Sequence, residues 1–396
     1  MGPGFTWVDE PGGLEELAAR LTGRPRLALD TEADGFHAYR PRLCLLQLGW
    51  EEEDGRVAVA LVDVPALGGR LGGVGEILAD PRVETVVHGA DYDVRLLARD
   101  AGVELRGLWD TQAAARLLGL PRTGLAALAE EIAGTRLSKA ARKVDWGRRP
   151  LPASALRYAA DDVRPLFAIR DELGRRLAAT GRDDWARQEF RRLEEVRAGE
   201  DDEPATPEEL VARFRGAGRY DPRRRAILAE ILAWRDAEAR RRGRPAVHVL
   251  APEAIRRIVE DPPRSLEELG ARGLPQRVVR RYGRDVLAAV RRGHRAPPLP
   301  RPRGRAGDRA PEGVHRLVRR LKEVRDRRAR ELGIEPGVLC PGAAIETVVR
   351  GAVATGGLPG EADLVAAGLL PWQAREVLDP FRAALAESLP GKGGTR

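Results

Sequence analysis

A chain of 396 residues, of which 43% are hydrophobic and 32% charged, is long enough for two or three globular domains. No segment approaches the roughly 18 uninterrupted apolar residues of a membrane span, and the amino-terminal residues lack the basic and apolar regions of a signal peptide. The two cysteines, Cys44 and Cys340, exclude a disulfide framework and a zinc cluster. We therefore expect a soluble, cytoplasmic protein.

The net charge of +8 is divided unevenly along the chain. Residues 1–200 contain 29 Lys and Arg against 33 Asp and Glu, whereas residues 201–396 contain 39 against 27. A basic half suits a polyanionic partner, most simply nucleic acid. The same charge would also keep helical domains soluble, so composition alone does not decide between these interpretations.

The first 90 residues predict strands combined with helices. Residues 12–21 form an amphipathic helix, with Leu14, Leu17 and Leu21 on one face. Apolar runs predict strands at 26–32, 42–50, 57–62 and 83–87, with a hairpin between the second and third and a helix at 66–78 before the last. This order favours a mixed sheet with flanking helices, an α/β layer architecture.

Asp30 and Glu32 end the first of these strands at positions i and i+2. Side chains two residues apart on a strand share a face, so two like charges lie close together. Such a pair needs compensation, and a divalent cation is the most economical form of it. The alternative is a surface turn at the end of a strand, where Asp is common.

A second group of carboxylates follows the strand at 83–87. The segment 88–93 lies where that strand meets a helix, at the carboxyl-terminal end of the strand. Open α/β sheets bind ligands at this edge. Asp91 is expected to cap the helix. Asp93 is then left for another role.

Residues 108–150 predict two further helices and a basic loop. Asp110 and Thr111 cap a helix over residues 112–118, and another helix covers residues 124–132. The next segment, residues 139–150, is polar and basic and contains Trp146. It suits a loop beside a polyanionic substrate, and equally an ordinary loop anchored by one aromatic side chain.

Residues 153–179 predict one long helix. Tyr158 and Asp162 are four residues apart on it, so they share a face, and that face points at the core. A carboxylate there needs a partner, either a metal ion or a nearby arginine. Asp161 is rotated away and is expected to face water.

Together these motifs resemble the DEDD 3′→5′ exonucleases, in the subgroup whose third motif carries a tyrosine, and within it the ribonuclease D family. The five-residue spacing between His and Asp in the second motif selects Asp93 over Asp91. Two connecting motifs, Asp-Thr-x-x-Ala at 110–114 and Asp-Trp-x-x-Arg-Pro-Leu at 145–151, occur in the same order. The three main motifs are Asp-x-Glu at Asp30 and Glu32, His-x-x-x-x-Asp at His88 and Asp93, and Tyr-x-x-x-Asp at Tyr158 and Asp162.

The resemblance implies a ribonuclease-H-like α/β exonuclease domain that binds two divalent cations, Mg²⁺ or Mn²⁺. It assigns Asp30 to both cations, Glu32 and Asp162 to the first, and Asp93 to the second. Four carboxylates form an oxygen-only site, which by itself favours Mg²⁺ or Mn²⁺ over Zn²⁺. Tyr158 would orient the attacking water rather than deprotonate it, because the ordinary pKa of tyrosine is about 10.

Gln47, Phe36 and His88 are further candidates for contact with the terminal nucleotide of a substrate. Packing in the core is the alternative for Gln47 and Phe36. For His88 the alternative is a packed, hydrogen-bonded role.

The basic half predicts small helical bundles. An acidic, Pro-containing linker at 201–207 precedes helices at 224–241, 252–259 and 278–290, with another opening near residue 265. Their order resembles the HRDC domain. The residues that carry this resemblance are Trp234-Arg235, Val249-Leu250, Pro263, Leu269 and Tyr282-Gly283.

A Pro- and Arg-rich linker at 296–311 leads to a basic helix at 314–332 and a second copy of the bundle. In this copy Leu317, Leu321 and Arg325 stand roughly where the Leu and Trp-Arg region stands in the first bundle. Positive bundles can hold phosphates without reading sequence, although they could also mediate only protein contacts. The expected domains are an exonuclease domain at 1–195, an HRDC domain at 208–295 and a divergent HRDC-like domain at 312–390.

The sequence thus predicts a metal-dependent 3′→5′ exoribonuclease that hydrolyses RNA from its 3′ end to nucleoside 5′-monophosphates. The family implies tRNA precursors as substrates and tRNA 3′-end maturation as the role, with no membrane or obligate protein partner. Two alternatives stay open. They are a 3′→5′ DNA exonuclease of the same fold, and a nucleic-acid-binding protein with an inactive nuclease domain, although the acidic set is complete.

Overall fold

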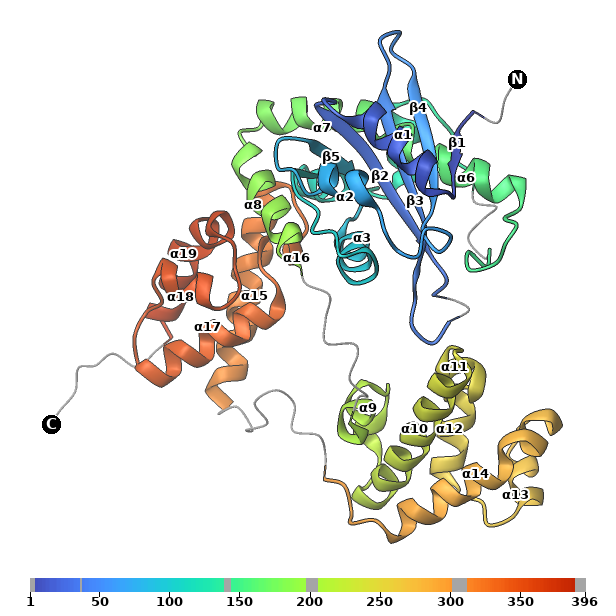
Figure 1. Ribbon diagram of the computed structural model, residues 1–396. Coiled ribbons are helices and arrows are strands. Elements are labelled where there is room, and N and C mark those ends of the chain that lie inside the picture. Colours follow the sequence, from blue (N-terminus) through green and yellow to red (C-terminus); the bar gives the residue numbers. More distant parts are fainter. Residues whose placement is uncertain (1–3, 36–37, 139–143, 197–205, 301–311, 389–396) are drawn as a thin grey trace, which may run out of the picture. The chain divides into compact units, whose positions relative to one another are not determined.

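The structure is a computed structural model that describes residues 4–35, 38–138, 144–196, 206–300 and 312–388 (Figure 1). By its internal contacts the chain forms two compact units. The first unit contains residues 1–32, 43–198 and 309–396, and the second contains residues 33–42 and 199–308. The α/β region therefore shares a unit with the last helical bundle, whereas the other bundle makes up most of the second unit.

A mixed sheet forms the centre of the first unit. Its strands are β1 (Thr6–Val8), β2 (Arg26–Ala33), β3 (Leu43–Glu51), β4 (Val57–Asp63), β5 (Glu84–Val87) and β6 (Leu108–Asp110). They lie in the order β1-β4-β3-β2-β5-β6. Strands β2, β5 and β6 are parallel, as are β1 and β4, whereas β3 and β4 are antiparallel. The expected α/β fold with a mixed sheet is confirmed.

The edge strands β1 and β6 were not predicted by the sequence pattern. Each has three residues, too few to show the alternation or the apolar run of a strand. Residues 108–110 pair with β5 before the next helix begins, so they extend the sheet rather than only preceding that helix.

Helices cover both faces of the sheet. Helix α6 packs against β3 and β4, and α7 packs against β5. Both therefore lie on the face that carries Ala28, Leu61 and Val86. The helices of this region are α1 (Pro11–Leu21), α2 (Gly72–Leu78), α3 (Asp91–Leu96), α4 (Thr111–Leu117), α5 (Leu125–Ile132), α6 (Ala153–Val163), α7 (Leu166–Ala179) and α8 (Asp183–Glu194).

Two expected helices differ in extent from the observed ones. Residues 153–179 form two helices, because Pro165 lacks the N–H group that would continue α6 and instead precedes α7. The helix expected at 66–78 begins only at Gly72. Gly68 and Gly69 before it have positive φ angles and form a turn that a helix cannot include.

The last helical bundle packs directly against the α/β region. Its Trp372 is fully buried and stacks on Trp185 of α8, with ring centroids 4.3 Å apart. Arg182 links the two parts by donating hydrogen bonds to the carbonyls of Leu117 at 2.6 Å and Leu332 at 2.5 Å. The helices of this bundle are α15 (Glu312–Leu332), α16 (Pro336–Leu339), α17 (Gly342–Thr355), α18 (Glu361–Ala366) and α19 (Pro371–Ala386).

The bundle of the second unit has its own core. Trp234 and Tyr282, two residues that carry the HRDC resemblance, meet in it edge to face at 5.7 Å. Its helices are α9 (Pro207–Arg213), α10 (Pro222–Arg242), α11 (Ala246–Val249), α12 (Pro252–Glu260), α13 (Leu266–Ala271) and α14 (Gln276–Arg295).

The two bundles repeat one internal contact. Arg235 on α10 donates to the carbonyl of Leu250 at 3.5 Å, and Arg325 on α15 donates to the carbonyl of Cys340 at 3.1 Å. The spacing between donor and acceptor is the same in both pairs. This repeat supports the equivalence that the sequence predicted for Arg325, although the second bundle lacks the tryptophan before it.

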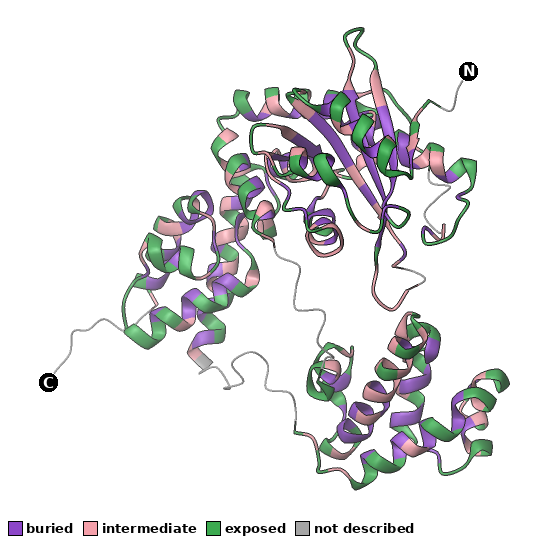
Figure 2. Cartoon of the chain, viewed as in Figure 1, coloured by how far each residue is buried: buried purple, intermediate pink, exposed green. Residues whose placement is uncertain are grey.

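In both bundles the buried residues lie where the helices face one another and the exposed residues lie on the outer sides (Figure 2), and the buried residues form apolar cores. Among the described residues, no helix combines the length and the apolar composition that crossing a membrane requires.

Candidate active site

Three carboxylates meet at the carboxyl-terminal end of β2. Asp30 and Glu32 lie on the face of β2 that α6 covers, and Asp162 approaches from the last turn of α6. One carboxylate oxygen from each of the three lies within 4.8 Å of the others. Within the described residues, neither Asp30 nor Glu32 forms an ion pair with an arginine, lysine or histidine. Residues of the first and third motifs thus form one cluster.

Asp93 lies beside this cluster rather than within it. It belongs to the first turn of α3, is 7% exposed, and accepts a hydrogen bond from the hydroxyl of Thr31. Its negative charge contributes to raising the pKa values of Asp30 and Glu32, so it is electrostatically coupled to them. Sequence reasoning did not anticipate the contact with Thr31, which sits between the two carboxylates of the first motif.

Burial and nearby negative charges raise the pKa values of Asp30, Glu32 and Asp93. Asp30 is half-buried, and burial followed by the charges of Asp93, Asp162 and Glu32 raises its pKa well above the usual value. Burial, followed by the charges of Asp162 and Asp93, raises the pKa of Glu32 to about 8. Burial raises the pKa of Asp93 to about 7, although the hydrogen bond from Thr31 opposes this shift. The cluster therefore favours bound protons or cations.

Tyr158 lies one helical turn before Asp162 on α6 and hydrogen bonds to it. Burial and the nearby charges of Asp162 and Glu32 raise the pKa of its phenol above the ordinary value. The hydroxyl therefore keeps its proton at neutral pH. Its ring also packs against Trp146, with centroids 6.4 Å apart, which holds it at the edge of the cluster.

His88 contacts other residues of the fold. Its Nδ1 lies 2.8 Å from the Thr111 hydroxyl, which in turn donates to the carbonyl of Val87 at 2.9 Å. Burial lowers its pKa, partly offset by the charge of Asp110, so the ring stays neutral. This geometry gives His88 a hydrogen-bonded packing role and leaves its contact with substrate a prediction.

The two other candidates for substrate contact lie differently. Gln47 on β3 is fully buried, and neither of its amide atoms has a hydrogen-bond partner. It therefore does not lie on the accessible surface of the cluster. Phe36 lies outside the described residues.

Asp110 has a larger structural role than the helix cap expected from sequence. It is 1% exposed and accepts hydrogen bonds from Gln112 and Ala113 at the start of α4 and from Gly89 and Ala90 before α3. It thereby fixes the turn that carries Asp93. The expected cap role of Asp91 is wrong: Ala90 stands at the cap position, and the carboxylate of Asp91 pairs with Arg95 at the surface.

The segment 145–151 is anchored to the sheet by Arg149. Its guanidinium donates to both carboxylate oxygens of buried Asp63, at 2.5 and 2.7 Å, and to the carbonyl of Cys44 at 3.0 Å. Trp146 is 4% exposed and packs against Tyr158. For these two residues the anchored-loop interpretation fits. Residues 139–143, which carry most of the expected basic charge, lie outside the described residues.

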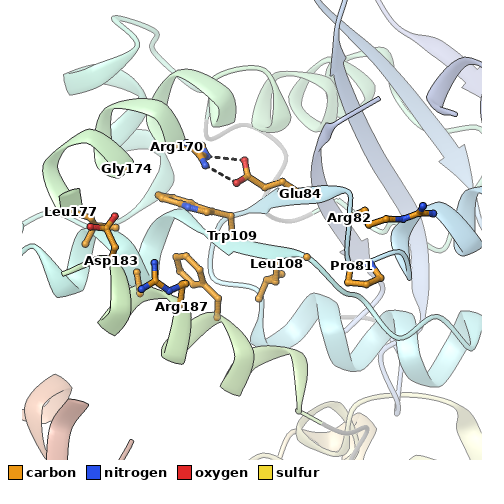
Figure 3. A pocket seen from close by; sticks show the side chains of 13 residues that line it. Pro81, Arg82, Glu84, Leu108, Trp109, Arg170, Gly174, Leu177, Asp183 and Arg187 are labelled. Carbon is orange, nitrogen blue, oxygen red and sulfur yellow. Dashed lines mark hydrogen bonds and ion pairs between the residues drawn. The ribbon is translucent and has the colours of Figure 1, made fainter. Parts of the chain in front are cut away.

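A cavity of 480 Å³ lies at the opposite end of the sheet, where β5 and β6 begin (Figure 3). Trp109 and Phe190 line it, and there the guanidinium of Arg170 donates to the two carboxylate oxygens of Glu84 at 2.7 and 2.6 Å. It contains none of the motif carboxylates. We therefore place the candidate active site at the carboxylate cluster and not at this cavity.

The residues of the cluster fit divalent cations. The donor set consists only of carboxylate oxygens, which suits hard ions such as Mg²⁺ and Mn²⁺. Asp30 and Glu32 lack a neutralising side chain within the described residues, and a cation would supply the missing positive charge. The chemistry that such a donor set supports is hydrolysis of a phosphodiester.

Comparisons with known families divide the chain into two matched regions. A 3′-5′ exonuclease family matches residues 5–178, and the HRDC domain matches residues 224–290. The first match contains every motif carboxylate and Tyr158. The second lies within the second unit.

The chain is similar along most of its length to curated and solved proteins. It is 34% identical to a ribonuclease D of Xanthomonas oryzae pv. oryzae over 87% of this chain and 91% of that one. It is 30% identical to a ribonuclease D of Pseudomonas paraeruginosa over 88% and 90%. The crystal structure of Escherichia coli RNase D, an exoribonuclease involved in structured RNA processing, superposes with a TM-score of 0.71 at 25% identity and covers 97% of this chain and 99% of that one.

Proposed function

Because the chain belongs to the ribonuclease D family and is a 3′→5′ exoribonuclease, we propose that it trims structured RNA, tRNA precursors above all, with two divalent cations held by its acidic cluster. The observation that carries this proposal is the meeting of Asp30, Glu32 and Asp162 within 4.8 Å. The products are nucleoside 5′-monophosphates and an RNA shortened at its 3′ end.

Each carboxylate has a separate place in this proposal. The charges of Asp93, Asp162 and Glu32 all act on Asp30, and Asp30 would contact both cations. Glu32 and Asp162 would complete the set around one of them, and Asp93 would serve the other. When bound, the cations supply an activated water and stabilise the charge on the departing 3′ oxygen.

Tyr158 orients the attacking water in this proposal. Its phenol stays protonated at neutral pH because burial and nearby carboxylates raise its pKa. The hydroxyl can therefore donate or accept a hydrogen bond but does not serve as a general base. Water attacks the phosphorus of the terminal nucleotide and releases one proton to solvent, the bond from phosphorus to the 3′ oxygen of the preceding nucleotide breaks, and that oxygen takes a proton from solvent.

The second unit offers a surface for the rest of the RNA. On α14 the exposed arginines lie on one face of the helix, while Tyr282 and Val286 point into the core from the other. Among the described residues, Arg277, Arg284 and Arg291 have no ion-pair partner. The arginine face consists of Arg277, Arg280, Arg281, Arg284, Arg291 and Arg295.

This arginine face would hold phosphates without reading sequence. Replacing Arg277, Arg284 and Arg291 by Gln in the full chain should weaken binding of a 3′-extended tRNA and lower the slope of log affinity against log salt by about 2. The matched control replaces Arg56, Arg82 and Arg175, which are exposed but already paired with carboxylates. Equal losses in the two triple variants would count against the surface on α14.

One gel experiment tests the proposed reaction. A 3′-extended tRNA is incubated with the protein in Mg²⁺, in Mn²⁺ and in excess EDTA, beside a DNA oligonucleotide of equal length. We expect shortening of the RNA from its 3′ end with either ion and none in EDTA. Shortening in EDTA would contradict the metal-dependent site, and faster cleavage of DNA would favour a DNA exonuclease of the same fold.

A further inference from the structure

Gln47 presents an energetic problem in the middle of the sheet. Its side chain is fully buried, and both Nε2 and Oε1 lack a hydrogen-bond partner among the described residues. A buried amide without partners costs free energy relative to an apolar side chain of the same size. Packing alone would favour Met or Leu at this position, so the amide calls for another explanation.

The position of Gln47 follows from its neighbours on either side. On β4 its pairing partner is Leu61, and Leu61 belongs to the apolar cluster that includes Ala28 and Val163. Because directly opposed residues share a face, Gln47 points to the side of the sheet that α6 covers. This is the side on which Asp162 approaches β2.

The strand on the other side brings Gln47 next to Asp30. β2 and β3 are neighbours joined by residues 34–42, and Asp34 N–H donates to the Arg42 carbonyl across this connection at 3.3 Å. So short a connection makes the two strands antiparallel. A Cβ added to Gly49 would lie 3.3 Å from the Cβ of Ala28. Because the strands run in opposite directions, the residue two positions after Ala28 lies beside the residue two positions before Gly49. Gln47 is therefore next to Asp30, on the same face of the sheet.

We propose that Gln47 is a positioning residue that donates a hydrogen bond from its side-chain amide to the carboxylate of Asp30 when divalent cations are bound. This inference rests on the proposed metal site. A carboxylate that contacts cations keeps lone pairs that point away from them, and a donor placed behind it fixes its orientation. Gln47 supplies such a donor from the neighbouring strand, and burial shields that hydrogen bond from water.

The test compares Gln47→Met with Thr85→Val. Met has nearly the length and shape of Gln but no amide. Thr85 on β5 is also fully buried with an unpartnered hydroxyl, and it pairs with Leu27, which places it on the other face of the sheet from Asp30. Each full-length variant is titrated with Mn²⁺ alone by calorimetry, and its melting temperature is measured in EDTA.

We expect Gln47→Met to weaken Mn²⁺ binding by about tenfold, with a melting temperature in EDTA equal to or above that of the wild type. Thr85→Val should leave Mn²⁺ binding unchanged. A Mn²⁺ affinity of Gln47→Met within twofold of the wild type would overturn the positioning role. A lower melting temperature in EDTA would also overturn it, because the amide would then serve packing. Failure of the wild type itself to bind Mn²⁺ would instead contradict the proposed metal site.

Discussion

The two ends of β2 carry charge in opposite ways. At its start Arg26 lies between two carboxylates, Glu51 and Asp171, each 2.7 Å from its guanidinium, and over the ring of Phe167. At its other end Asp30 and Glu32 have no ion-pair partner within the described residues. The same strand thus has a compensated end and an uncompensated one.

The neighbouring strand shows the same contrast. Glu84 begins β5 opposite Arg26 and is paired with Arg170 at the cavity seen in Figure 3. Beyond the end of β5, Asp93 adds a further negative charge to the cluster. The chain therefore has arginines available for its sheet but places them away from the cluster. At the uncompensated end the carboxylates repel one another, and this repulsion lowers the stability of the folded protein when no cation is bound. A bound cation would reduce the repulsion.

The largest expected effect comes from removing a carboxylate at the uncompensated end. Asp30→Asn or Asp162→Asn should lower the rate of RNA shortening by at least about a thousandfold, because each would remove a proposed cation contact and with it about 4 kcal/mol of transition-state stabilisation. Rates are measured on a 3′-extended RNA in Mg²⁺. The matched control is Asp161→Asn, since Asp161 is exposed and paired with Arg164. A loss in this control equal to that of Asp162→Asn would remove the distinction between the neighbours.

The next effect is the pH dependence of stability in EDTA. Burial and repulsion raise the pKa values of Glu32 to about 8 and Asp93 to about 7, so the folded state binds protons that the unfolded state has released. This stabilisation is present below the unfolded pKa values and is lost as the pH rises through the folded ones. We expect the free energy of unfolding to fall by several kcal/mol between pH 5 and 8.5, at about 1.4 kcal/mol per pH unit for each group that is protonated only in the folded state. Denaturant melts measure it, and saturating Mg²⁺ should abolish the fall.

At the compensated end the expected effect is smaller and concerns only stability. Arg26→Met leaves two carboxylates without their partner and should lower the free energy of unfolding by about 1–2 kcal/mol. Activity per folded molecule should stay unchanged. Arg56→Met is the control, because Arg56 and its partner Asp54 are both exposed and their removal should not change stability. A change in Mn²⁺ affinity for Arg26→Met would mean that the two ends are coupled.

The smallest effect has the opposite sign. Glu32→Gln removes one charge from the repelling cluster and should stabilise the protein in EDTA at pH 8.5 by at least about 1 kcal/mol. At pH 5 the gain should be smaller, because the Glu32 carboxyl of the folded protein is already neutral there. Denaturant melts at the two pH values check this. A destabilised variant at pH 8.5 would show that Glu32 is compensated after all.

This contrast was partly visible in the sequence. Alternation on a strand and a four-residue spacing on a helix predicted which faces carry Asp30, Glu32 and Asp162, because both patterns are local. Contacts between distant segments leave no such pattern. The hydrogen bond from Thr31 to Asp93 joins residues 62 positions apart, and no periodic pattern in the sequence predicts it.

The fold shows the same division between local and distant information. Four of the strands and the HRDC-like helices were predicted from apolar runs and periodicity. The two edge strands have three residues each and depend on pairing with a neighbour. The stack of Trp185 on Trp372 joins two regions that the sequence predicted as separate domains. The sequence around each tryptophan indicates only a core residue and does not indicate its partner.

The stack of Trp185 on Trp372 also determines how a truncation of the chain would affect the first unit. The chain leaves the first unit after residue 198 and re-enters it at residue 309, so the HRDC domain is an insertion and not an appendage. A stop codon placed before the HRDC domain would remove Trp372 and Leu332 as well and leave Trp185 and Arg182 without these partners from the last bundle. Testing what the HRDC domain contributes to RNA binding therefore requires excising it internally and rejoining the ends, because a truncation would change the nuclease unit at the same time.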